Sequence, residues 1–64
     1  MDSALLETAL RVLNAITARI APDPQDATFL RDNAYPFDSN LELDDLACFI
    51  VQNELKKRHT HAAG

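Results

Sequence analysis

The most apolar part of the chain is an unbroken run of six residues, Leu46–Val51. Successive residues of a helix lie ~100° apart around its axis, so such a run leaves no polar side. A run this short also fits a buried strand, but Leu43 before it and Glu54 to Arg58 after it keep helical spacing, and no second strand is predicted to pair with it. We therefore predict a helix over residues 40–58. A helix that is apolar all round is either buried all round or covered in part by a partner.

The first helix is predicted over residues 3–21, where apolar positions recur every three or four residues. Asp2 or Ser3 is suited to cap its start, and Pro22 is expected to end it. Glu7 and Arg11 are spaced for an ion pair. The expected core stripe is Leu6, Ala9, Leu10, Leu13, Ile16 and Ile20, widened by Leu5 and Val12, with Thr8 on the opposite side.

A short helix is predicted over residues 24–34. Asp23 fits the N-cap and Pro24 the first helical position, where its missing N–H has no cost. Pro36 biases the residue before it away from the helical region, which limits the length. With Ala27, Leu30 and Ala34 on its apolar side, this helix is expected to act as a lid.

The connector to the last helix holds two aromatic residues, Tyr35 and Phe37, which we expect to tuck under the neighbouring helices. Ser39 and Glu42 match a capping box, which would start the last helix at about residue 40. The alternative start lies a turn later, with Asp44 and Asp45 in the first turn.

These elements predict an all-α fold, a small three-helix domain of two long helices and one short one. The expected organisation is a single helical domain over residues 1–58, followed by a flexible C-terminal tail over residues 59–64. The packed stripe of the last helix is predicted to be Leu43, Leu46, Ala47, Ile50 and Val51, continued by Leu55.

The length of 64 residues allows one domain at most, and a domain this small is only marginally stable unless something supports it. Cys48 is the single cysteine, which excludes an intramolecular disulfide and a cysteine-based metal cluster. No membrane span and no signal peptide are predicted, so we expect a cytoplasmic protein with a reduced thiol.

No catalytic, cofactor-binding or metal site is predicted, and the protein is not expected to be an enzyme. Asp38, Asn40 and Glu42 have the spacing that opens a calcium loop, but the glycine and the final glutamate of that loop are missing. His59 and His61 have no third ligand nearby. Glu54 is expected at the rim of the core, with Arg58 as its nearest cation.

The flank of the last helix that carries Cys48, Phe49 and Gln52 is the expected partner-binding surface, because a contiguous exposed apolar surface marks an interaction site. An equally favoured interpretation is that the short helix and Phe37 cover this flank. The partner would be a second copy, giving a homodimer, or a larger protein. The alternative is a small nucleic-acid-binding regulator that uses the basic cluster of Lys56, Lys57 and Arg58. The net charge of −4 makes nucleic acid the less favoured partner.

Overall fold

A computed structural model describes residues 3–63, with side chains described for residues 4–58. Within that range the chain forms three helices and no strand: α1 (Ser3–Thr17), α2 (Pro24–Asp32) and α3 (Leu43–Ala63). The predicted all-α, three-helix domain is therefore confirmed.

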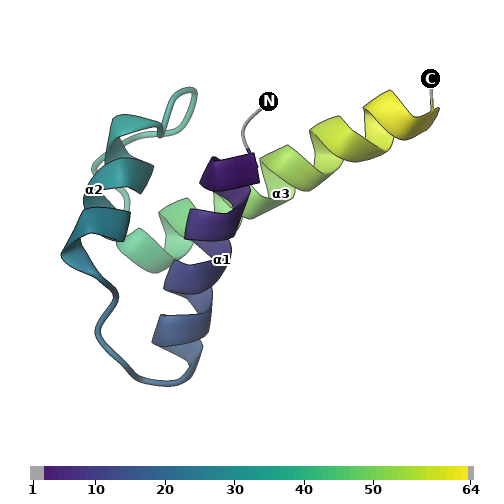
Figure 1. Cartoon of the computed structure of the whole chain (residues 1–64). Helices are drawn as coiled ribbons and strands as arrows, with labels where there is room; N and C mark the ends of the chain where they lie inside the picture. The colour runs from purple at the N-terminus through teal and green to yellow at the C-terminus, as the bar shows by residue number, and fades with distance from the viewer. Residues whose placement is uncertain (1–2, 64) are drawn as a thin grey trace.

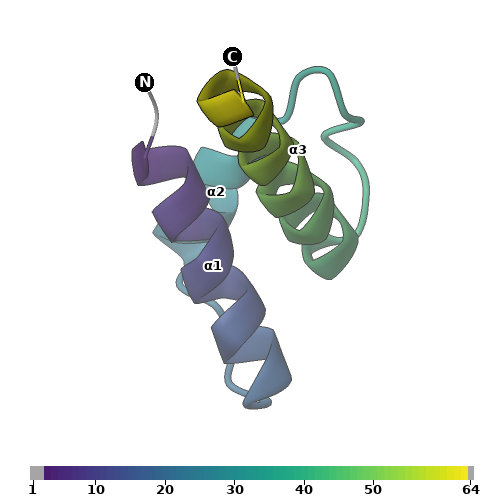
Figure 2. The same cartoon turned by 90° about the vertical axis from the view of Figure 1, so that its right-hand side faces the viewer.

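The three helices pack into an elongated body of 38 × 22 × 17 Å. Figure 1 shows α1 crossing the first half of α3, with α2 beside both of them. The second half of α3 extends away from the other two helices, and Figure 2 shows the same helix running obliquely beside α1. The far end of α3 is consequently not covered by α1 or α2.

The core lies where the three helices meet. Its buried residues come from all three helices and from the segment after α2: Ala9, Val12, Leu30, Ala34, Leu46, Ala47 and Ile50. Leu30 and Leu46 are wholly buried, so α2 contributes a central side chain of the core rather than a lid over it.

The buried side of α1 is rotated relative to the predicted stripe. Val12 is buried, whereas Leu10 and Ile20, both predicted for the core, are exposed. Thr8 is buried instead of facing solvent, and its hydroxyl donates to the Ala4 carbonyl oxygen at 2.7 Å. A threonine can occupy this buried side because the preceding turn of its own helix satisfies its hydroxyl.

Helix α1 ends at Thr17, so the predicted end at residue 21, just before Pro22, is wrong. Arg19 has a φ of 62°, the left-handed conformation. The amide of Ile20 donates to the Ala15 carbonyl at 2.8 Å, and the amide of Arg19 donates to the Ile16 carbonyl at 3.0 Å. This pair of bonds is the Schellman motif that closes many helices, usually with glycine at the left-handed position.

Helix α2 begins as predicted. The Asp23 carboxylate accepts a hydrogen bond from the Gln25 amide at 2.8 Å, and Pro24 occupies the first turn. Tyr35, in contrast, is 94% exposed, so only Phe37 of the two connector aromatics turns inward.

Helix α3 begins at Leu43, with Asp44 and Asp45 in its first turn, as in the alternative start. The Glu42 carbonyl accepts the Leu46 amide at 2.9 Å, so Glu42 is the boundary residue and Ser39 does not cap this helix. The helix continues past the predicted end to Ala63. The predicted tail of residues 59–64 stays a prediction, because its side chains and all of Gly64 lie outside the described residues.

Candidate functional site

The side of α3 that faces away from the core carries six exposed residues, which we call the outer face of α3: Asp45, Cys48, Phe49, Gln52, Leu55 and Lys56. Phe49 is 41% exposed and Leu55 is 52% exposed. Leu55 was predicted for the core stripe. It falls outside because the buried side of α3 follows Leu46, Ile50 and Glu54 instead. All three residues predicted to bind a partner, Cys48, Phe49 and Gln52, lie on this face.

Phe49 is held in place by Phe37. The two rings stack with centroids 5.5 Å apart and planes 19° from parallel. Beside this pair lies a groove of about 230 Å³, lined by Phe37, Phe49, Gln52, Asn53 and Lys56. Stacking orients the Phe49 ring and covers only part of it, so apolar surface stays open at a fixed position.

Cys48 and Gln52 lie one turn apart on the same face. The Gln52 side-chain amide approaches the Cys48 sulfur at 3.4 Å, and the thiol is free and exposed. The outer face therefore combines apolar and polar groups.

Glu54 marks the limit of the buried side of α3. It is only 8% exposed, and the Lys57 ammonium donates to its carboxylate at 3.1 Å. Glu54 is thus buried rather than at an exposed rim, and its cation is Lys57, three residues on, and not Arg58.

The alternative site, Lys56, Lys57 and Arg58, lies on the projecting part of α3, and all three residues are exposed. Consecutive residues point ~100° apart around a helix, so these three cations diverge. Lys57 is also paired with Glu54. The cluster does not form the continuous basic stripe that phosphate backbones favour.

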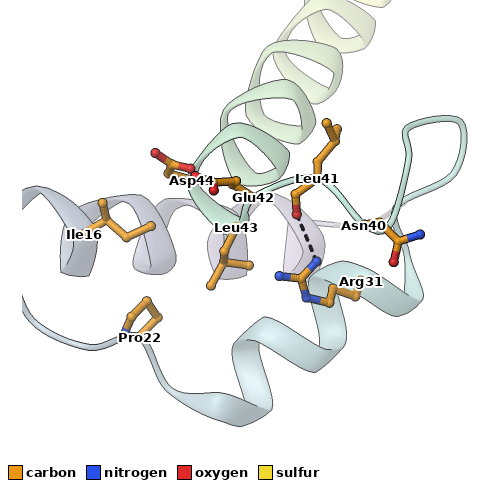
Figure 3. Close-up of a pocket in the computed structure, with 8 residues that line it drawn as sticks. All are labelled: Ile16, Pro22, Arg31, Asn40, Leu41, Glu42, Leu43 and Asp44. Atoms are coloured by element: carbon orange, nitrogen blue, oxygen red, sulfur yellow. Dashed lines mark hydrogen bonds between the residues drawn. The ribbon is translucent and has the colours of Figure 1, made fainter.

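A second, more open depression of about 580 Å³ lies where α1, α2 and the start of α3 meet (Figure 3). Arg31 from α2 reaches across it and donates to the main-chain carbonyls of Ser39, at 2.6 Å, and Leu41, at 3.0 Å. The Arg31 guanidinium thus holds the connector against α2 by hydrogen bonds. Glu42 and Asp44 also line the depression and add two carboxylates to it. These contacts explain the depression as a structural junction.

Arg11 and Asp26 join α1 to α2 by a two-point ion pair, with nitrogen–oxygen distances of 3.2 and 3.1 Å. The hydrogen bond from Arg11 holds the pKa of Asp26 below its usual value, and the same bond raises the pKa of Arg11. The sequence spacing had suggested Glu7 as the partner of Arg11. No local signal identifies Asp26, because the pair spans two helices.

Among the residues with described side chains, no group of three His, Cys, Asp or Glu residues could hold a metal ion. Asp38, from the rejected calcium pattern, accepts the Asn40 amide at 2.8 Å in a turn. His59 and His61 lie outside this set. Across the described helices, no segment has the length and apolar character needed to cross a bilayer.

Comparison of the chain with family models, curated proteins and solved structures finds no match.

Proposed function

We propose that this protein is a small interaction module that binds another protein chain through the outer face of α3. The observation that carries the proposal is Phe49, which is 41% exposed although its ring is already fixed by stacking on Phe37. A large aromatic residue held rigidly at the surface loses little conformational freedom when a partner covers it. Aromatic residues, phenylalanine among them, are enriched at the core of protein interfaces.

The strength of binding follows from the exposed apolar surface. A phenylalanine presents ~200 Å² in all, so the 41% still exposed on Phe49 is roughly 80 Å². At ~25 cal/mol per Å², covering it contributes about 2 kcal/mol. Association costs at least ~4 kcal/mol in lost freedom of motion. Phe49 therefore needs the rest of the outer face, and the expected complex is weak and reversible.

The proposal includes a cytoplasmic location. It is supported by Cys48, a free and exposed thiol that is compatible with a reducing compartment.

The test is photo-cross-linking in living cells, with a light-activated amino acid in place of Gln52. The matched control carries the same amino acid in place of Tyr35, which is 94% exposed but lies on the connector. We expect a discrete protein adduct from position 52, its loss when Phe49→Glu is added, and no such adduct from position 35. The substitution Phe49→Glu changes a half-exposed ring, and circular dichroism checks that the helices persist.

Equal labelling from both positions, or no protein adduct from position 52, would overturn the proposal. Adducts to nucleic acid would overturn it too, in favour of the alternative regulator that uses Lys56, Lys57 and Arg58. A salt titration with generic duplex DNA separates that case, because phosphate contacts weaken steeply as salt increases.

A further inference from the structure

The outer face of α3 carries opposite charges at its two ends. Asp45 lies in the first turn and Lys56 lies eleven residues later, and both are exposed. The spacing of Asp45, Phe49, Gln52 and Lys56 follows the four-, three- and four-residue steps that keep side chains on one side of a helix. At 1.5 Å per residue, the two charges are about 16 Å apart along the axis.

This pattern is complementary to itself when reversed. In an antiparallel pair of α3 helices with its two-fold axis midway along this stretch, Asp45 of each copy lies opposite Lys56 of the other. Phe49 of each copy then lies opposite Gln52 of the other, beside the groove that Gln52, Asn53 and Lys56 line. A two-fold interface has this reciprocal form, in which residue i meets j and j meets i.

We propose that the partner is a second copy of this chain, packed α3 against α3 in antiparallel orientation. The inference rests on the proposed function, because it uses the same face. The parallel arrangement is disfavoured: it places Asp45 against Asp45 and Lys56 against Lys56, and like charges in contact oppose association. The surrounding charges agree, since Glu42 and Asp44 precede the stretch and cations follow it.

The contact is confined to one face of one helix, so the dimer lies at the small end of the range for specific interfaces. A small interface with exposed charge pairs forms a reversible dimer whose association weakens at high salt. The paired stretch lies mostly in the first half of α3, where the core is packed against the opposite side of the helix, along Leu46 and Ile50. The projecting second half of α3 is not flanked by α1 or α2 of its own chain (Figure 1).

The test is sedimentation equilibrium at low salt with two charge reversals, Asp45→Lys and Lys56→Asp. We expect the unmodified chain to dimerise reversibly and each reversal alone to lower the association constant at least tenfold. Mixing the two variants in equal amounts should restore dimers, because the two basic positions of the Asp45→Lys variant then face the two acidic positions of the Lys56→Asp variant. The matched controls are Asp32→Lys and Arg19→Asp, which make the same charge changes at exposed positions elsewhere and should stay within about twofold of the unmodified chain.

The mixing step also guards against misfolding, because an unfolded variant would not regain a partner. If the unmodified chain dimerises but the mixture stays monomeric, the antiparallel register is wrong. If the chain stays monomeric up to millimolar concentration while position 52 still cross-links a different protein, the second copy is not the partner and the proposed function stands. If the chain is monomeric and position 52 forms no protein adduct, both the dimer and the proposed function are wrong.

Discussion

Glu54 is the charged residue whose replacement is expected to stabilise the fold. It lies on the buried side of α3, one turn after Ile50, and is 8% exposed. The cation paired with it, Lys57, is itself largely in solvent, with 66% of its side chain exposed. We predict that Glu54→Leu stabilises the protein, whereas Lys57→Met destabilises it.

The magnitudes follow from the burial of the two partners. Replacing a desolvated charge by an apolar group of similar size is often stabilising by ~1–4 kcal/mol. The low end applies to Glu54, about 1 kcal/mol, because Lys57 keeps the pair near water. Removing Lys57 leaves the carboxylate of Glu54 desolvated without its cation, at a cost of about 0.5–1 kcal/mol. For a domain of this size, a change of about 1 kcal/mol shifts the melting temperature by ~4–8 °C.

The assay is thermal unfolding followed by circular dichroism, at a protein concentration low enough that the melting temperature does not depend on it. The expected result is opposite shifts from the two members of one ion pair. If Glu54→Leu lowers the melting temperature while Lys57→Met leaves it unchanged, the carboxylate makes a stabilising contact other than the one with Lys57, and the reasoning fails.

Three further predictions concern the body of the fold. Arg19→Gly should stabilise it by about 0.5 kcal/mol, because relief of the left-handed conformation outweighs the extra freedom of glycine in the unfolded chain; a lower urea midpoint would contradict this. Leu30→Ala should lower the free energy of unfolding by about 2–5 kcal/mol, which is close to the whole stability of so small a domain, and should abolish cooperative thermal unfolding. A sharp unfolding transition would show that Leu30 is not central to the core. Asp26→Asn should lower the urea midpoint at neutral pH but not in acid. The pKa of Asp26 is lowered in the fold by its bond from Arg11, so its stabilisation is present above about pH 4 and disappears as pH falls through the lowered pKa. A midpoint difference that persists in strong acid would refute that cause.

The parts of the fold that depend on neighbouring residues could be predicted from the sequence. Asp23 and Pro24 identify the start of α2 because capping is a local interaction. The apolar spacing identified the three helices. The end of α1 was missed because an arginine at position 19 adopts the conformation that glycine usually supplies.

The contacts between helices could not be predicted in this way. Arg11 is spaced for Glu7 but pairs with Asp26 of α2, and Arg31 binds carbonyls of the connector. Both contacts depend on how the helices are placed relative to one another, and the spacing of residues along one helix gives no information about that placement. The outer face of α3 could be predicted from the sequence only in part. The excess of apolar residues on α3 indicated an exposed flank, but the stacking of Phe37 on Phe49 required the fold.

The most direct test of the outer face is the identity of the chain that lies against Gln52 in the cell. Mass spectrometry of the adduct formed from that position gives both its mass and its attachment point. We predict an adduct of two copies of the 7.1 kDa chain, joined from position 52 of one to the neighbourhood of Phe49 of the other. The absence of any protein adduct from position 52 would contradict the claim that this face binds a partner.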